Sequence, residues 1–473
     1  MNAIVKKLLW KEFQELKWET AASAAIVLTL PVCLAFRDAN LALMTIMPNI
    51  WLYPILAGVF FGARAAAGER TGRTASFVAA LPVSHRLLGM VRLAATFLAS
   101  MLPLAMLWVL AMFLNSLVDE NSRMQSPWLS GIFLLALLAT ISCISVAARA
   151  GLGQSTEIRA GLIGFAAVLG ALMVGGLWLF VVLLMLQSHY DQPPPWAEAA
   201  MLGCSLIAGI PATIFVAAWF INGYSRALGI LDTPSLKGWT FPDWRLRIFS
   251  APLSALVGKA VREMGLMGLE VLGVSLLLSI VAGMLGITNS IVAGRATTVV
   301  ELAMGALPVI LAAGGFVLAL LVGVGAVIGD VQPGVNTFWR SRPISPRAWY
   351  WTNYGVGLVT MVLAVEIPAL LVGLTGGQVG GNHGVLIWLL MWNLAFTFAL
   401  TATCLLRKPG AAALLAFAAV HILYSLAAAA FDIVTPGEQG AAPPEIIAPV
   451  FAVAFFGSTA IGSWAAVNDV AVT

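Results

Sequence analysis

The chain has 473 residues, of which 60% are apolar and only 10% charged, and its formal net charge is +4. In a soluble domain roughly a quarter of the residues are charged. This chain therefore lacks the polar side chains needed to cover a water-facing surface of its size. The composition excludes a set of soluble domains and predicts an integral membrane protein of the all-α class.

Cysteines and the N-terminus give two further expectations. All four cysteines lie inside apolar runs, without the spacing of metal ligands, and are expected to be small core residues. They are Cys33, Cys143, Cys204 and Cys404. No metal site is expected, although His189, Asp191 and His383 fall on predicted outer loops. No cleavage site follows the polar N-terminus, so the first apolar run is expected to remain in the protein.

Residues 1–20 are predicted to form an amphipathic helix. Apolar residues recur at helical spacing, Lys7, Lys11 and Glu15 follow another face at steps of four, and Trp10 and Trp18 suit the headgroup layer. One interpretation is a helix that lies along the membrane surface. The alternative is a polar extension of the first membrane-spanning helix.

Apolar runs of about 20 residues predict about 12 transmembrane helices. They are expected near 21–37, 48–67, 87–115, 129–148, 160–186 and 199–221, then near 266–287, 303–328, 348–374, 385–406, 410–430 and 447–467. The polar interval 222–252 is predicted to be a cytoplasmic linker. The domains are therefore a first six-helix half at 1–221, the linker, and a second six-helix half at 253–473.

One segment occurs twice, each time after the second predicted span of a half. In Gly68–Ser84 and Gly329–Ser345 an acidic residue follows a glycine, a phenylalanine comes nine positions after that glycine, and Pro-(Val/Ile)-Ser begins five positions later. Arg262-Glu263 also resembles Lys11-Glu12. Two copies at one spacing predict an internal repeat. Because each half has an even number of helices, the two halves are expected to be parallel repeats.

The distribution of basic residues predicts the orientation. Only Arg37, Arg123 and Arg295 of the 25 basic residues fall on one side of the predicted spans. The positive-inside rule therefore places both termini, the linker and both repeated segments in the cytoplasm of a multi-pass protein of the cell (inner) membrane.

The repeated segments resemble a known family. Glu69-Arg70-Thr71-Gly72-Arg73-Thr74, Phe77 and Leu81-Pro82-Val83-Ser84-His85-Arg86 are similar to the cytoplasmic segment of type-2 ABC exporter permeases, and the Lys11-Glu12 helix is similar too. Phe338 to Ser345 resembles the same segment in the second half, although Asp330 replaces the glutamate and Pro333 interrupts the loop. In that family, the surface helix and this segment contact an ATPase subunit and transmit its motion to the membrane helices.

The resemblance implies that this chain is a permease subunit with two cytoplasmic ATPase partners. The residues implied to contact them are Lys11, Glu12, Glu69, Arg70, Gly72, Phe77, Pro82, Ser84, Arg262, Glu263, Asp330, Phe338, Trp339, Arg340, Pro343 and Ser345. The sequence has no G-x-x-x-x-G-K-[ST] stretch. ATP and Mg are therefore expected to bind to the partner, and the chain itself is not expected to be an enzyme. No nucleic-acid partner is expected. The scarcity of charges in the spans suggests a lipophilic or amphipathic substrate. An interfacial role for the repeated segments, with arginines on lipid phosphate, is the alternative.

Glu366 supports a rival hypothesis. It lies within a predicted span, two residues before Pro368, and carboxylates in a membrane usually have a function. It could bind a cationic substrate, relay protons in an ion-coupled secondary transporter, or cap backbone groups that the proline frees. His421 is expected to be a core residue. A third class, a membrane scaffold without a transport pathway, would need none of these residues.

Overall fold

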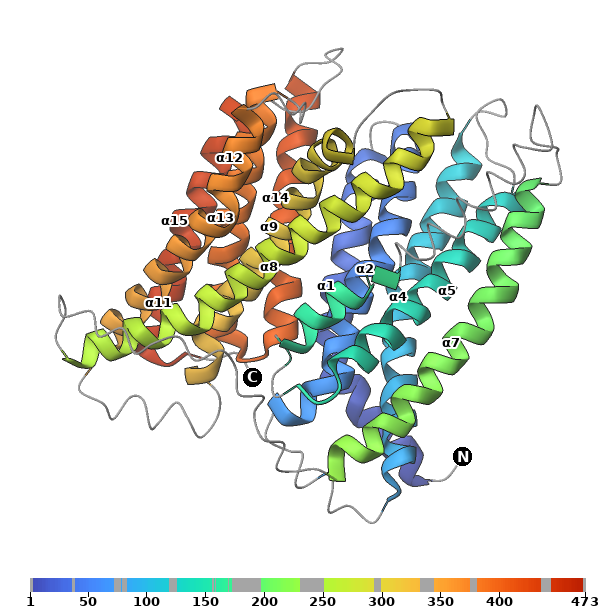
Figure 1. Ribbon diagram of the computed structural model, residues 1–473, viewed down its shortest axis with the longest axis horizontal. Helices are drawn as coiled ribbons and strands as arrows, with labels where there is room; N and C mark the ends of the chain where they lie inside the picture. The colour runs from blue at the N-terminus through green and yellow to red at the C-terminus, as the bar shows by residue number, and fades with distance from the viewer. Residues whose placement is uncertain are drawn as a thin grey trace. The chain divides into compact units, whose positions relative to one another are not determined.

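The computed structural model describes residues 3–35, 39–71, 78, 83–118, 126–154, 157, 159–168, 170–171, 197–229, 251–292, 299–331, 344–374, 381–434 and 444–470. Within these ranges the chain is almost entirely helical (Figure 1), which confirms the all-α prediction. Seven of the described helices are long and apolar enough to cross a membrane. Together with the composition, they indicate a multi-pass membrane protein.

The chain divides into two compact units, Met1–Gly238 and Trp239–Thr473, with the boundary inside the predicted linker. The long helices of the first unit are α1 (Ala3–Ala35), α2 (Ala39–Thr71), α4 (His85–Leu117), α5 (Ser126–Gly151) and α7 (Ala197–Gly229). A shorter helical stretch covers 159–168, while 172–186 of the predicted fifth span lie outside the described residues. The second unit contains α8 (Ala251–Val292), α9 (Val299–Val331), α11 (Pro346–Met361), η2 (Val362–Glu366), α12 (Ile367–Leu374), α13 (Gly381–Leu406), α14 (Pro409–Val434) and α15 (Pro444–Asn468).

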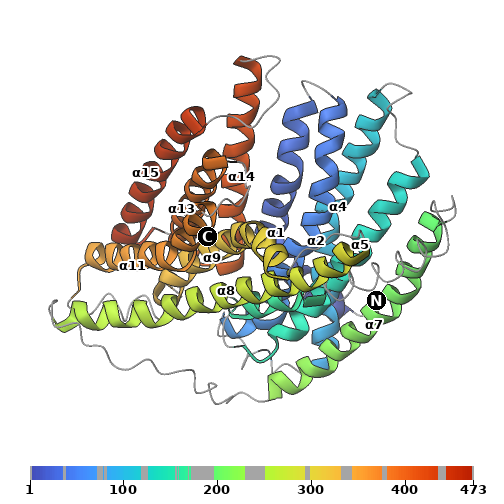
Figure 2. The same cartoon turned by 45° about the horizontal axis from the view of Figure 1, so that its top comes forward.

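In the first unit, α1, α2 and α4 pack against one another, as Figure 2 shows. Helix α5 packs against α2 and α4, and α7 packs against α4 and α5. Small side chains form the contacts of α2: Ala63, Ala66 and Ala67 pack on Ala160 of the stretch 159–168. Backbones without large side chains between them approach closely, which is how helices associate in lipid.

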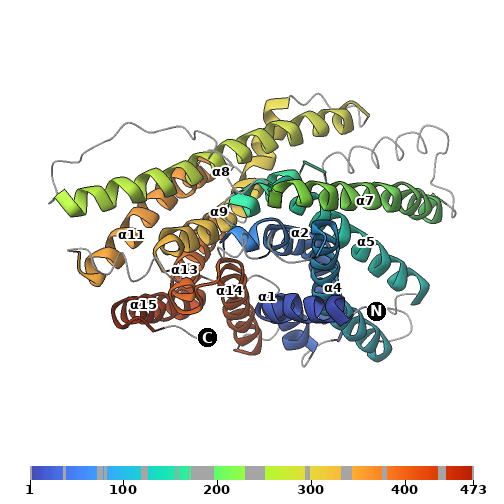
Figure 3. The same cartoon turned by 90° about the horizontal axis from the view of Figure 1, so that it is seen from below.

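In the second unit, α8 lies alongside α9 and α11 (Figure 3), and α9 also packs against α11. Helix α13 packs against α9, α11, α14 and α15, and α15 also packs against α11 and α14. The largest buried side chains of this unit include Trp349, Tyr350, Trp392 and Phe396. Trp392 donates its indole N–H to the carbonyl oxygen of Ala312 at 3.1 Å, so the buried polar atom is satisfied.

Helix α1 is continuous from Ala3 to Ala35, without a break after residue 20. At 1.5 Å per residue it is about 50 Å long, whereas the hydrocarbon core is about 30 Å thick. Helix α8 is longer still, with 42 residues. The continuous helix favours the second interpretation of residues 1–20: the polar segment extends the first span beyond the membrane.

Glycines allow very close helix contacts in the second unit. A Cβ on Gly323 would lie 2.5 Å from the carbonyl oxygen of Phe396, and one on Gly315 would lie 2.6 Å from the Trp392 ring. Helices α9 and α13 therefore meet at these glycines with no room for a side chain.

We expect Gly323→Ala to destabilise the protein by about 1–3 kcal/mol, because the new methyl group collides with backbone that cannot move aside cheaply. The measurement is the midpoint temperature of unfolding in detergent, followed by tryptophan fluorescence. Gly329→Ala in the same helix is the matched control, since its Cβ would meet nothing within 4 Å. The contact would be refuted if the two substitutions changed the midpoint equally.

Candidate functional site

An acidic residue near the C-terminus of α2 is the centre of the candidate site. Helix α2 ends at Thr71, so Glu69 lies in its last turn. The negative end of the helix dipole disfavours a carboxylate there. The Glu69 side chain is also only 8% exposed, and a buried charge must be paired. Local structure and burial together require cations from neighbouring helices.

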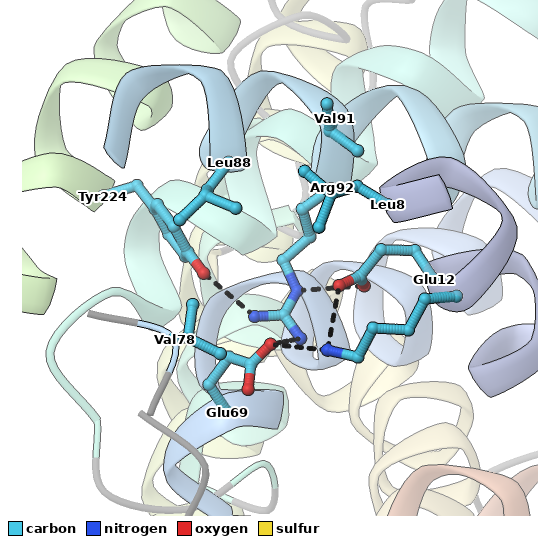
Figure 4. A pocket seen from close by; sticks show the side chains of 9 residues that line it. Leu8, Glu12, Glu69, Val78, Leu88, Val91, Arg92 and Tyr224 are labelled. Atoms are coloured by element: carbon cyan, nitrogen blue, oxygen red, sulfur yellow. Dashed lines mark hydrogen bonds and ion pairs between the residues drawn. The ribbon is translucent and has the colours of Figure 1, made fainter. Parts of the chain in front are cut away.

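Two cations meet this requirement (Figure 4). Arg92 of α4 places Nη2 3.3 Å from Glu69 Oε1, and Lys11 of α1 places Nζ 3.7 Å from the same oxygen. The Nε atom of Arg92 lies 3.5 Å from Glu12 Oε2, and Nη1 donates to the Tyr224 hydroxyl of α7 at 3.1 Å. The Arg92 side chain is 4% exposed. One guanidinium thus joins four helices.

The network continues along α1 to a second arginine. Lys11 also lies 3.5 Å from Glu15, one turn along the helix. Arg64 of α2 pairs with Glu15 at 3.1 Å and with Glu157 at 2.6 Å. We call the group Lys11, Glu12, Glu15, Arg64, Glu69, Arg92, Glu157 and Tyr224 the ionic network. It lies at the C-terminal end of α2 and the N-terminal end of α4, beside the polar half of α1.

Burial determines what the ionic network contributes. Removing charges from water costs several kcal/mol per ion, so a buried network adds little net stability, but removing one member leaves another charge unpaired. For Lys11, burial alone lowers the pKa of the ammonium, but the carboxylates of Glu69, Glu15 and Glu12 outweigh burial and raise it above its ordinary value. Lys11 therefore stays charged, and α1, α2, α4 and α7 are held in one arrangement.

The second unit has a simpler counterpart at the end of α9. Asp330 lies next to the last residue of that helix. Lys259 of α8 pairs with Asp330 Oδ1 at 2.7 Å, and Trp349 of α11 donates its indole N–H to Oδ2 at 2.8 Å. These contacts join α8, α9 and α11, just as the contacts of Lys11, Glu69 and Arg92 join α1, α2 and α4. The arginine is replaced by a neutral indole, and the Lys259 side chain is 43% exposed.

These contacts give a different register from the sequence comparison, which matched Lys11 with Arg262. With Lys11 matched to Lys259, the buried residues of the first helices also coincide. They are Leu16, Thr20, Ser23 and Val27 in α1 and Met264, Gly268, Val271 and Ser275 in α8. The side chains of Arg262 and Glu263 are exposed, whereas Lys259 pairs directly with Asp330.

The structure brings some predicted site residues together and leaves others apart. Lys11, Glu12 and Glu69 belong to the ionic network. Ser84 and Ser345 are N-caps: their side chains accept from the backbone N–H of Leu87 at 3.3 Å and of Ala348 at 3.2 Å. Pro346 follows at the first position of α11. The serine that ends each repeated Pro-(Val/Ile)-Ser is therefore a helix start signal. Outside the described residues lie Gly72, Phe77, Pro82, Phe338, Trp339, Arg340, Pro343 and the side chain of Arg70.

Glu366 lies in a different environment. It ends the π-helical segment η2, where Ile367 donates its backbone N–H to the carbonyl oxygen of Val362, five residues earlier. Pro368 follows and has no N–H to donate, so a π turn in this place is expected. The Glu366 side chain is half-buried and accepts from the amide of Asn393 on α13 at 2.8 Å. The hydrogen-bond partner of Glu366 is thus a side chain of a neighbouring helix. The capping hypothesis had expected Glu366 to bind backbone groups that Pro368 leaves without a partner.

Sequence reasoning missed Arg64, Arg92, Glu157, Tyr224 and Lys259. Arg64 and Arg92 lie inside predicted apolar spans, and the signal was there: an arginine in such a segment is costly and needs a partner. No pattern in the sequence identified the partners, which come from helices far apart in the chain. Cys143 and Cys404 are buried, as expected. Among the described residues, no three metal-ligating side chains cluster.

No family model, no curated protein and no solved structure matches this chain. The resemblance of the repeated segments therefore stands on the residues quoted above.

We expect Glu69→Gln to destabilise the first unit by up to about 3–5 kcal/mol, because the buried Arg92 then loses one of the carboxylates that pair with it. Asp330→Asn is the matched change in the second unit. It should cost about 0–1 kcal/mol, since Lys259 can turn into solvent and the amide oxygen still accepts from Trp349.

Urea unfolding of the purified protein in detergent measures both effects. Adding Arg92→Met to Glu69→Gln removes the unpaired charge and should recover part of the loss. Equal destabilisation by Glu69→Gln and Asp330→Asn, or no recovery in the double variant, would show that burial of Arg92 does not make the difference.

Proposed function

We propose that this chain is the transmembrane permease subunit of an ATP-binding-cassette exporter. In this proposal, about 12 membrane helices form two parallel six-helix repeats, and ATP hydrolysis with Mg occurs in two separate cytoplasmic ATPase subunits. The observation that carries the proposal is a shared arrangement: in each unit, a lysine of the first helix pairs with the acid at the start of the repeated segment.

Helix packing within each unit supports the repeat. The pairings of α1, α2, α4, α5 and α7 all recur when these helices are replaced by α8, α9, α11, α13 and α15. The helix after the repeated segment begins with a serine N-cap in both units, and the cap residues have nearly the same backbone angles, φ −62° and ψ 134° for Ser84 and φ −65° and ψ 143° for Ser345. Chance similarity of short motifs would not produce a matching set of neighbours.

The ionic network suggests how a cytoplasmic partner would act on the membrane helices. The segment 72–82 connects Glu69, at the end of α2, with the Ser84 cap of α4. A force on that segment reaches α1, α2, α4 and α7 together, because Arg92 and Lys11 join them. Helices connected by a buried ionic network move together and so transmit a displacement, whereas a loosely packed segment would absorb it.

The remaining parts of the proposal follow from the sequence. The basic residues favour cytoplasmic termini, linker and repeated segments, in the cell membrane. Because few charges lie in the spans, an apolar or amphipathic substrate fits the pathway best. Two repeats in one chain could complete the pathway without a second copy.

The experiment is co-purification from native membranes with a tag on this chain, followed by an ATPase assay. We expect an ATPase with a phosphate-binding loop to be retained, and Phe77→Ala combined with Phe338→Ala to lose it. Phe113→Ala combined with Phe456→Ala is the control, because these side chains are 59% and 69% exposed on α4 and α15 and belong to neither repeated segment. The proposal fails if no such ATPase is retained, or if both double variants lose it equally.

A secondary transporter is the second candidate, and Glu366 is the observation that favours it. A half-buried carboxylate within a spanning helix, hydrogen-bonded to Asn393, is a suitable proton carrier. In proteoliposomes, Glu366→Gln would abolish a flux driven by a pH gradient if this candidate is right. Unchanged ATP-driven flux in the same variant would exclude the role.

A further inference from the structure

An apolar groove runs between α8 and α11 in the second unit, with a volume of about 560 Å³. Its sides include Leu269 and Leu272 of α8 and Trp351 and Val359 of α11. This volume lies in the range of small-molecule and cofactor sites. The side chains at its edge are well exposed, with Trp351 at 49% and Leu269 at 57%.

Two glycines open the groove, one from each helix. A Cβ on Gly265 or on Gly355 would meet nothing within 4 Å, and both residues line the groove. Further along, a Cβ on Gly268 would lie 2.9 Å from Thr360. The helices therefore touch at Gly268 and leave space beside Gly265 and Gly355. A long, thin apolar ligand fits such a space better than a compact one.

Basic residues lie at the level where α11 begins. Lys259 and Trp349 reach the same Asp330 carboxylate, so these positions of α8 and α11 are at one height. Arg262 is three residues beyond Lys259, and Arg347 is one helical turn before Trp351; both side chains are exposed.

We propose that this groove binds an anionic membrane phospholipid, with one acyl chain between α8 and α11 and the phosphate near Arg262 and Arg347. Clusters of basic residues beside membrane helices recognise anionic headgroups. Most of the apolar lining follows these arginines along the chain, from Gly265 to Leu272 of α8 and from Trp351 to Ala364 on the facing helix. The proposal does not depend on an ATPase partner, and the lipid is a resident ligand of the protein.

The chain offers a matched comparison in its first unit. Arg86 follows the Ser84 cap as Arg347 follows Ser345. In the register set by Lys11 and Lys259, however, Gln14 occupies the position of Arg262. The first unit thus has one of the two arginines, and Arg86→Gln removes an equivalent charge away from the proposed groove.

The test is native mass spectrometry of the full chain, delipidated in detergent and then mixed with phosphatidylglycerol or phosphatidylcholine. We expect retained phosphatidylglycerol in preference to phosphatidylcholine. Affinity for phosphatidylglycerol should fall roughly five-fold for each arginine removed in Arg262→Gln and Arg347→Gln. The double change to lysine should preserve most of the preference, and Arg86→Gln should leave it unchanged.

A second variant tests the groove without changing any charge. Gly265→Leu places a side chain in the open space and should reduce retention of both lipids, while gel filtration checks that the protein remains folded. The proposal is overturned if the wild type retains both lipids equally, if the arginine variants keep the preference, or if folded Gly265→Leu binds lipid like the wild type.

Discussion

A buried guanidinium cannot be left unpaired, and this constraint organises the first unit. Arg92 lies inside a long apolar helix, where an isolated charge would be too costly. It is tolerated because Glu12, Glu69 and Tyr224 reach it from α1, α2 and α7. These contacts fix the position of each of the three helices along its axis relative to Arg92. The polar half of α1 and the last turn of α2 supply the two carboxylates that pair with this one side chain.

The second unit meets the same need with fewer charges. Trp349 replaces the arginine as donor to the acid, and an indole N–H needs no counter-ion. Asn353 is buried where the helix numbering from the serine caps places Arg92 in the first unit. In the second unit, the contact between the three helices therefore consists of one half-exposed ion pair and one neutral hydrogen bond. If both sets of contacts transmit motion from a partner, the ionic network of the first unit is the stiffer of the two. The two halves would then not respond equally.

The sequence predicted the parts of the fold that depend on local composition. Apolar runs depend on neighbours within a few residues, and the all-α class followed from them. The continuity of α1 was not predictable, because a change from polar to apolar composition does not reveal whether a helix bends. The π-helical segment η2 also has a local cause, Pro368. The sequence shows this proline but does not show that the helix before it changes from α to π geometry.

The candidate site was only half predictable. Glu69 could be identified because it belongs to a repeated segment, and Lys11 because the Lys11-Glu12 pair resembles Arg262-Glu263. Arg64, Arg92 and Tyr224 could not be matched to them, since they are separated from their partners by tens of residues and depend on how the helices pack. The pairing of Lys259 with Asp330 shows the same limit: sequence similarity pointed to Arg262, whereas the register of buried residues selects Lys259.

Side-specific labelling of single cysteines tests most directly whether the two units are repeats with the same orientation. After replacement of the four native cysteines, Arg86→Cys and Arg347→Cys place one thiol at the matching, exposed position of each unit. The account predicts that a membrane-impermeant maleimide labels both only in inside-out vesicles, and labels Asp119→Cys only in right-side-out vesicles. Labelling of Arg86→Cys and Arg347→Cys from opposite sides would contradict it, because the repeats would then be inverted and could not offer the same face to a cytoplasmic partner.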